Sequence, residues 1–314
     1  MARVDELPQR LQIPLQNHDK HLFVRTTLEG TDGGLFLLDT GAAINAIGMG
    51  LAGRLKLPAV GNGTAMGIAG AENFIYRQVH QLSIGALELD SQRLAAINMN
   101  RFATSMGTNV NGVIGFNSLR KAPFTIDYKN QILTVHRPQE FQPPEDAILS
   151  PLQIHRGLPM VRADLGHNRQ VWMIIDTGAD SEVTLPAYYM EQWPEIVSIP
   201  MGGAGRSAGV GGYAKHMSTW LKNITLLGVQ LHDVPVNFET SGAETCGRRP
   251  NIGRLGHRLL ENFRLTFVPH RHEIWAEFQP AQQSQADLSP LPFIHARLLA
   301  QPVKMPSGGE LVVP

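Results

Sequence analysis

Short apolar runs, many alternating with polar residues and broken by turn residues, dominate this chain and predict a mainly β protein. The clearest runs lie at 22–26, 35–38, 160–165, 171–175, 224–227 and 234–238. Helical patterns are few and short, and we expect them at 48–55, 116–121, 186–192 and 257–262. Glycine (31) and proline (21) are frequent, which suits a fold with many turns.

One pattern occurs twice: an apolar run ends in an acid, and a small hydroxyl residue, glycine and alanine follow. The copies are Leu37-Leu38-Asp39-Thr40-Gly41-Ala42 and Ile174-Ile175-Asp176-Thr177-Gly178-Ala179. A lone carboxylate at the end of a buried strand is costly. The repeat therefore predicts that the two halves of the chain face each other and bring Asp39 and Asp176 together.

The elements around these turns recur in the same order. Glycine-rich segments predict two hairpin tips, one at Gly67, Ile68, Ala69 and Gly70, the other at Gly209, Val210, Gly211 and Gly212. Apolar segments with two glycines follow at 112–115 and 253–256. A proline-rich joint lies near 138–146. We expect an N-terminal lobe at 1–140, a C-terminal lobe at 141–280, and a tail at 281–314 without an assigned role.

The composition of the chain argues against some classes of binding partner. Lys+Arg and Asp+Glu number 27 each, so no overall field attracts nucleic acid or an anionic membrane. No apolar run approaches the roughly 18 residues of a membrane span. For the location we favour the periplasm or secretion, after removal of a leader that is not present in this sequence. The single cysteine, Cys246, cannot form an internal disulfide, and we interpret it as an inert loop thiol.

Two carboxyl groups that share one proton and one water can carry out peptide hydrolysis. Like charges this close do not both ionise. One carboxylate then activates the water as general base, while its protonated partner hydrogen-bonds the carbonyl oxygen. We expect no cofactor. The sequence leaves open which of Asp39 and Asp176 is ionised.

These ordered motifs resemble those of retropepsin-like aspartic proteases, of the bacterial kind in which two subunit-like halves are fused into one chain. The resemblance covers roughly 18–278 and implies a bilobal acid-protease fold. Its two pseudo-symmetric, β-barrel-like lobes would place the active site at their interface. The resemblance also implies an aspartic endopeptidase with Asp39 and Asp176 as catalytic residues. Because both acids lie in one chain, we expect a monomer.

The resemblance assigns further roles around the acids. Thr40 and Thr177 would cross-bond through their hydroxyl groups, and Gly41 and Gly178 would leave their backbone open to the substrate. The glycine-rich hairpins would act as flaps over a polypeptide bound as an extended strand. Each later glycine-bearing segment would pack against the strand that carries the acid of its half.

The two halves differ around the expected cleft. Asp180 follows the second turn, as in retroviral enzymes where that acid contacts substrate backbone, whereas Ala43 stands at this place in the first half. Arg254 occupies the position of Val113 in the first half. It could pair with Asp180, favour an acidic substrate residue, or remain a solvated arginine at the rim. We assign Val113, Asp180 and Arg254 to substrate binding.

Other interpretations are weaker. Glycines at 203–208 satisfy a loose dinucleotide-binding spacing, but Pro200 precedes them and no amphipathic helix follows. His270 and His272 could hold a metal, yet no third ligand is evident, and we interpret them as an exposed strand end. A non-catalytic peptide-binding module remains an alternative, as does hydrolysis of one specific partner or a cross-linking peptide. Retention of both acids argues against the binding module, because a binding cleft needs no destabilising like-charge pair.

Overall fold

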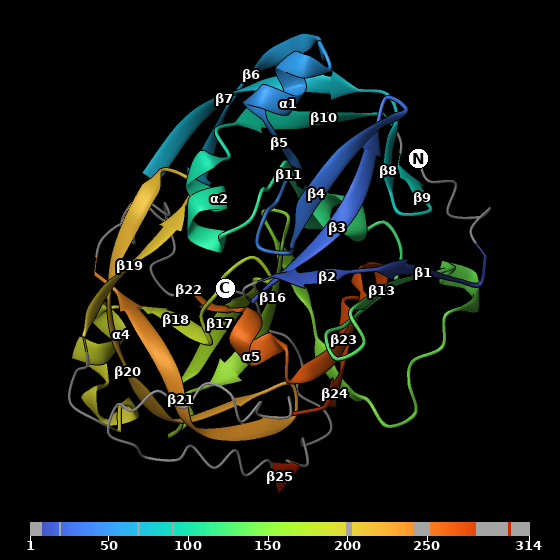
Figure 1. Cartoon of the computed structure of the whole chain (residues 1–314). Coiled ribbons are helices and arrows are strands. Elements are labelled where there is room, and N and C mark those ends of the chain that lie inside the picture. Colours follow the sequence, from blue (N-terminus) through green and yellow to red (C-terminus); the bar gives the residue numbers. More distant parts are fainter. Residues whose placement is uncertain are drawn as a thin grey trace.

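The computed structural model describes residues 8–18, 20–67, 70–89, 91–198, 203–240, 252–280 and 301–302. The fold is mainly β and has two lobes, as predicted, with the first half of the chain in the upper part of Figure 1. Ile68, Ala69, Cys246 and the tail at 281–314, apart from 301–302, lie outside the described residues. Among the described residues, no helix has the length and apolar character needed to cross a membrane.

A ten-stranded sheet builds the N-terminal lobe. Its order is β6 (Ala59–Gly67), β7 (Gly70–Val79), β10 (Gln92–Ile97), β5 (Ala46–Gly48), β11 (Gly112–Gly115), β4 (Thr31–Asp39), β3 (His21–Leu28), β8 (Leu82–Ile84) and β9 (Leu87–Leu89). The tenth strand, β2 (Gln16–His18), pairs with β3. Alternating buried and exposed residues along β3 show the period-two pattern expected of a strand with one face on the core.

A nine-stranded sheet builds the C-terminal lobe. Its order is β15 (Gln153–His155), β16 (Leu158–Asp164), β17 (Gln170–Ile175), β22 (Ile252–Leu255), β18 (Val183–Pro186), β21 (Val229–Glu239), β20 (Gly212–Leu226) and β19 (Ala204–Gly209). A short strand, β25 (Gln301–Pro302), pairs with β21. The long β20–β21 ribbon runs along the lower edge of Figure 1.

A six-stranded sheet joins the lobes. Its order is β1 (Arg10–Pro14), β13 (Ile132–His136), β12 (Phe124–Asp127), β23 (Phe263–Val268), β24 (Glu273–Phe278) and β14 (Ile148–Pro151). At its centre β12 pairs with β23, and the hydroxyls of Thr125 and Thr266 hydrogen-bond at 2.8 Å. The fully buried rings of Phe124 and Phe267 stack 4.6 Å apart. Main-chain pairing and a shared core therefore hold the two halves together.

In each half, a strand from later in the chain packs against the strand that leads to the acid. β11 pairs parallel with β4, opposing Gly115 to Asp39, and antiparallel with β5. β22 pairs parallel with β17, opposing Leu255 to Ile175, and antiparallel with β18. The predicted packing of the two glycine-bearing segments is thus confirmed.

The helices are short. They are α1 (Met49–Arg54), α2 (Asn100–Met106), α3 (Phe116–Leu119), α4 (Tyr188–Gln192) and α5 (His257–Leu260), with 3-10 turns η2 (Pro138–Glu140), η3 (Pro194–Ile196) and η4 (Pro269–Arg271). Four α-helices fall within the predicted ranges, but α2 does not. Only Met106 of α2 is buried, so an apolar stripe is missing. Its local signals are Asn98, whose side chain accepts the N–H of Asn100 at 3.0 Å, and Gly107 in the left-handed region.

Two weaker interpretations also fall on described elements. His270 and His272 are exposed, as predicted, but they lie in and directly after the turn η4 between β23 and β24 and not on a strand, and His272 has a φ of 55°. Residues 203–208 lie mainly in β19, the first strand of a hairpin. Within the described residues, no group of three or more His, Cys, Asp or Glu side chains could hold a metal ion.

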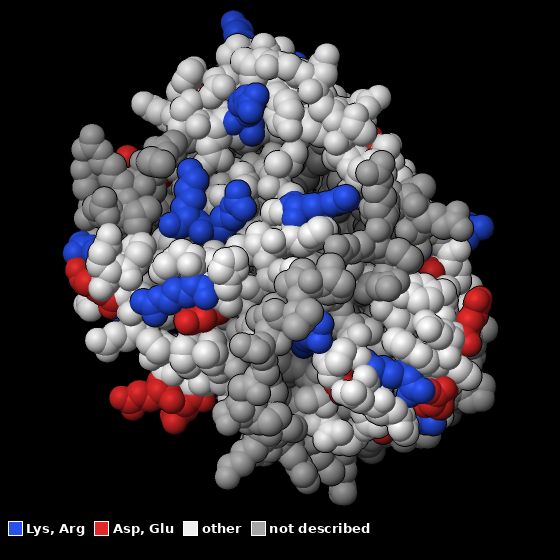
Figure 2. Space-filling model, turned by 180° about the vertical axis from the view of Figure 1, so that it is seen from behind, with Lys and Arg blue, Asp and Glu red and all other residues white. Residues whose placement is uncertain are grey.

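Charges of both signs share the surface. Figure 2 shows basic and acidic side chains on the same face of the molecule, several of them side by side. This distribution agrees with a formal net charge of zero. The face in that view therefore offers no uniform field for a polyanion.

Candidate active site

The two acids stand where buried strands end in turns. Asp39 is the last residue of β4, and Asp176 directly follows β17. In each turn a backbone N–H bonds back to the acid's own carbonyl oxygen at 3.3 Å, from Ala42 in the first half and from Ala179 in the second. The two halves therefore hold the backbone of their acids in the same way.

The two carboxyl groups lie against each other, close enough for the charge of Asp176 to raise the pKa of Asp39. Glycines allow this approach. A methyl group built on Gly178 would lie 2.5 Å from Cγ of Asp39, and one built on Gly41 would overlap the carboxyl group of Asp176. Each turn thus packs its glycine against the acid of the other turn, where a larger residue would displace the carboxyl group.

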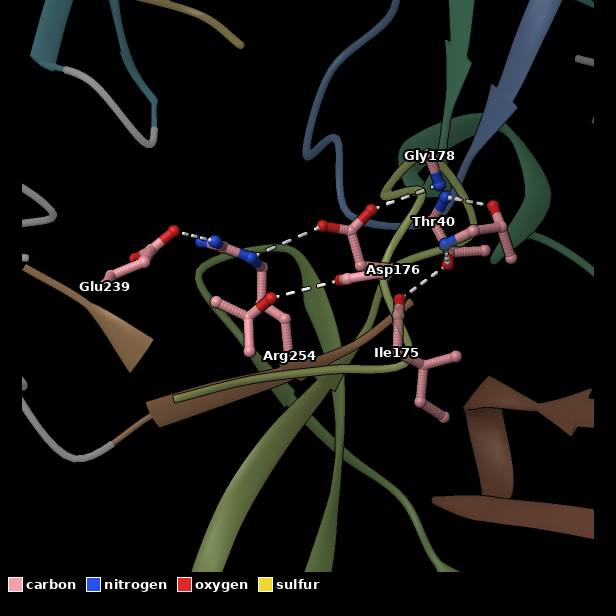
Figure 3. A network of polar contacts seen from close by, with 9 residues as sticks. Thr40, Ile175, Asp176, Gly178, Glu239 and Arg254 are labelled. Atoms are coloured by element: carbon pink, nitrogen blue, oxygen red, sulfur yellow. Dashed lines mark hydrogen bonds and ion pairs between the residues drawn. The ribbon is translucent and has the colours of Figure 1, made fainter. Parts of the chain in front are cut away.

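Thr40 and Thr177, both fully buried, hold the two turns together, and Figure 3 shows Thr40 beside Ile175 and Gly178. The hydroxyl of Thr40 donates to Ile175 O at 2.6 Å and accepts the N–H of Thr177 at 3.1 Å. The hydroxyl of Thr177 donates to Leu38 O at 2.6 Å and accepts the N–H of Thr40 at 3.0 Å. This reciprocal set of four bonds fixes the positions of the acid-bearing strands relative to each other.

Burial has the largest effect on the pKa values of the two acids. It raises the pKa of Asp39 well above the usual range, and the charge of Asp176 raises it further. Burial also raises the pKa of Asp176, while the Arg254 guanidinium opposes that rise. The pair therefore keeps a proton at pH values where exposed aspartates are fully ionised.

Arg254 lies inside the cleft, so its interpretation as a solvated rim arginine is wrong. Its side chain is only 16% exposed, and its Nε lies 3.9 Å from Oδ2 of Asp176. Its Nη2 ion-pairs with Oε1 of Glu239 (Figure 3). Asp180 lines the same cleft but is exposed. The arginine thus bridges a buried glutamate and one of the two acids.

A cavity of about 480 Å³ opens at the acids and has unlike walls. The N-terminal wall is mainly apolar, and it includes Leu37, Phe74, Ile97, Phe102, Met106 and Val113. The C-terminal wall is polar, and it includes Asp180, Ser181, Thr184, Ser207 and Arg254. A ligand in the cavity would therefore meet an apolar surface on one side and polar or charged groups on the other.

Two β-hairpins, one from each lobe, reach the cavity and meet at their tips. They are β6–β7 and β19–β20, and the end of β7 lies beside β19 at the left of Figure 1. A methyl group on Gly67 would overlap Val210, and one on Gly211 would lie 2.5 Å from Gly70 O. Gly67, Gly209 and Val210 line the cavity.

A polar contact joins the hairpins as well. The N–H of Gly211 donates to Oε2 of Glu72 on β7 at 3.2 Å, and the same oxygen ion-pairs with Arg101 of α2. Gly211 and Gly212 have φ values of 87° and 129°, which glycine adopts readily at a hairpin tip. The tips are therefore fixed by side-chain as well as backbone contacts.

Sequence reasoning missed Glu239 and Glu72. Glu239 ends β21 and comes near Arg254 because β18 pairs with both β21 and β22. The signal in the sequence that could have identified Glu239 is its position as an acid at the end of an apolar strand. Glu72 carries no comparable signal, because its partner hairpin lies in the other lobe.

The structure is a two-lobed, mainly β fold in which two acids face each other between the lobes. Residues 24–118 match a family model described as aspartyl protease. The matched range contains Asp39, the β6–β7 hairpin and β11. No curated protein matches the chain significantly. The family match confirms the resemblance to aspartic proteases that the repeated motifs indicate.

Proposed function

We propose that this chain is an aspartic endopeptidase that activates a water between Asp39 and Asp176. The observation that carries the proposal is the reciprocal packing of Gly41 on Asp176 and of Gly178 on Asp39, which brings two partly buried carboxyl groups beside each other. Such a pair is destabilising, and water activation by a shared-proton pair is the chemistry that uses it.

In the proposed reaction, the ionised acid takes a proton from the water as the water oxygen attacks the carbonyl carbon. The protonated acid gives its proton to the carbonyl oxygen, which forms a neutral diol. When the C–N bond breaks, the first acid passes its proton to the amine and the second recovers a proton from a diol hydroxyl. The pair returns to its starting state, so no cofactor enters the balance.

We propose a polypeptide in extended form as the substrate. The cavity of about 480 Å³ between the lobes supports this, as do the hairpins, which would act as flaps with exposed backbone groups near their tips. The apolar wall around Val113 suits a large apolar side chain on one side of the scissile bond. Asp180, exposed in the cavity, would contact the substrate backbone. Both acids come from one chain, so a monomer with lobes at 1–140 and 141–280 would suffice.

The test is cleavage of a library of unfolded peptides between about pH 3 and pH 8, with cuts mapped by mass spectrometry. The wild type is compared with Asp39→Asn and Asp176→Asn. Asp32→Asn is the matched control, because Asp32 lies on the same strand as Asp39 but is exposed. We expect both site variants to lose cleavage and the control to keep it.

Binding without turnover would contradict the proposal. If folded wild-type protein binds library peptides but leaves them intact across the pH range, the peptide-binding module replaces the protease. If Asp39→Asn and Asp176→Asn cut as fast as the wild type, hydrolysis comes from elsewhere.

A further inference from the structure

The two halves differ in charge at one equivalent position beside the acids. Val113 on β11 lies opposite the residue two places before Asp39. Arg254 on β22 lies opposite the residue two places before Asp176. An uncharged side chain and a permanent cation therefore occupy the same place relative to the two acids.

Arg254 is held in this place from its other end. Its Nη2 pairs with Glu239, and this leaves Nε 3.9 Å from Oδ2 of Asp176 (Figure 3). The side chains of Arg254, Asp176 and Glu239 are 16%, 15% and 9% exposed. Water screens the interaction little at such burial, so the cation acts strongly on the acid it faces.

Asp39 has different surroundings. The backbone N–H groups of the turns lower the pKa of both acids alike, but the charged group that acts on Asp39 is the acid Asp176 and not a cation. Its Oδ1 is buried and has no hydrogen-bond partner among the described residues. A negative charge on Asp39 would therefore be less stabilised than one on Asp176.

Other titratable groups lie near the two acids, and none of those described below makes a negative charge more stable on Asp39 than on Asp176. His21 and Asp180 line the same cavity, one from each lobe. Burial raises the pKa of the Tyr128 phenol most. The charges of Glu261 and Asp176 add to this rise, which places Tyr128 near Asp176. Glu239 offsets part of the charge of Arg254, but the arginine still opposes the rise in the pKa of Asp176.

We propose that Arg254, positioned by Glu239, places the single negative charge of the pair on Asp176 and leaves the shared proton on Asp39. The inference rests on the proposed function, in which the singly ionised pair is the active state. Arg254 is then a positioning residue and not a substrate contact. Burial and the charge of Asp176 raise the pKa of Asp39, whereas Arg254 limits the rise at Asp176, in agreement with this assignment.

The assignment gives each acid one role. Asp176 takes the proton of the attacking water, and Asp39 gives its proton to the carbonyl oxygen. As the C–N bond breaks, Asp176 delivers its proton to the amine and Asp39 recovers one from the diol.

The first experiment compares pH profiles of kcat/KM. Arg254→Met removes the cation, so both pKa values of the pair rise and the acidic limb moves up by about one pH unit. Glu239→Gln leaves Arg254 unopposed, so the limb moves down. Arg254→Lys keeps the charge and stays closer to the wild type than Arg254→Met. Arg162→Met, an exposed arginine on β16, is the matched control and leaves the limb in place.

Opposite shifts for Arg254→Met and Glu239→Gln support the inference, because loss of structure alone would not change the sign. Equal shifts in one direction, or loss of rate with unmoved limbs, would overturn it.

A second experiment needs no turnover. Aspartate carboxyl carbons labelled with ¹³C are titrated by NMR in Asp39→Asn, where Asp176 titrates alone, and in Asp39→Asn/Arg254→Met. We expect the pKa of Asp176 to rise by about one unit on loss of Arg254. In the Asp176→Asn background, Arg254→Met should shift Asp39 less. An equal shift on both acids contradicts the inference, even if peptide cleavage is never observed. Conversely, a selective shift without cleavage retains the charge assignment and rejects the protease.

Discussion

Gly178 packs on Asp39 so closely that one added methyl group would lie 2.5 Å from Cγ of the acid. Gly41 bears the same relationship to Asp176. The contact between the two carboxyl groups therefore depends on the absence of a single carbon atom on each opposing turn.

Gly178→Ala should displace Asp39 and lower kcat/KM by about 100-fold or more, because catalytic geometry tolerates little movement. Overpacking should also lower the free energy of unfolding by about 1–3 kcal/mol. The matched control is Gly53→Ala in α1, where an added Cβ meets nothing within 4 Å. Steady-state kinetics and urea unfolding measure both effects. Full activity of Gly178→Ala would show that the close contact is not needed.

Thr177→Val should destabilise the fold by about 2–4 kcal/mol, because it leaves Leu38 O and the N–H of Thr40 buried without their partner. Thr40→Val should act alike. The loss in free energy of unfolding of the double variant should be smaller than the sum of the two single losses, because one substitution already loosens the shared hydrogen-bond network. Urea unfolding gives the three values, with Thr27→Val on the exposed face of β3 as control. Strict additivity would contradict a coupled network.

The acid pair should make stability fall as pH rises. The pKa of Asp39 is raised by burial and by the charge of Asp176, so the folded protein holds this proton more tightly than the unfolded chain. The stabilisation is complete below about pH 4, the ordinary pKa of aspartate, and is lost as pH rises through the folded-state value. Urea unfolding between about pH 4 and pH 7 should therefore show a smaller loss for Asp39→Asn than for the wild type. Parallel curves would contradict the raised pKa.

His257 should act in the opposite direction. It is fully buried, neither ring nitrogen has a hydrogen-bond partner in the part of the chain that the structure describes, and Nε2 lies 3.7 Å from Glu261. Burial, with the charges of His21 and Arg258, lowers the pKa of His257 to about 3. Its stabilisation is present above about pH 6.5 and is lost as pH falls toward 3, by at most about 1.4 kcal/mol per pH unit.

Phenylalanine should remove this acid sensitivity. Phe116 begins α3 as His257 begins α5, and both donate their N–H to a carbonyl of the nearby acid turn. His257→Phe is therefore expected to flatten stability between about pH 3 and pH 6, while His80→Phe at an exposed site should not. Thermal unfolding followed by circular dichroism at several pH values provides the comparison. An unchanged slope for His257→Phe would assign the sensitivity to other groups.

Much of the fold could be predicted because its signals are local. The runs at 35–38 and 171–175 end in strand-to-turn transitions, and the four predicted helices have short apolar patterns after glycine or proline. α2 could not be predicted from periodicity, because it buries one residue and ends at a glycine. The turn at His270 and His272 escaped for a related reason, since strand and tight turn share the same short polar pattern there.

The candidate site divides in the same way. The repeated turn identifies Asp39 and Asp176 as residues to compare, because two identical turns in matching order are visible in one dimension. For Arg254, the sequence showed only that an arginine stands where the first half has Val113, and it left three interpretations open. Its contacts with Asp176 and Glu239 arise from the pairing of β22 with β17 and β18, which no local pattern encodes.

The sequence by itself determined the mainly β fold and the repeated pattern of the two acid turns, because these depend on residues near one another in the chain. Tertiary structure decided which groups surround each acid. It placed the cation of Arg254 beside Asp176, whereas the uncharged Val113 occupies the equivalent position near Asp39. It also brought the two hairpin tips together through Glu72. The physical reason is that burial and Coulomb interactions depend on distances across strands and lobes, and folding alone sets those distances.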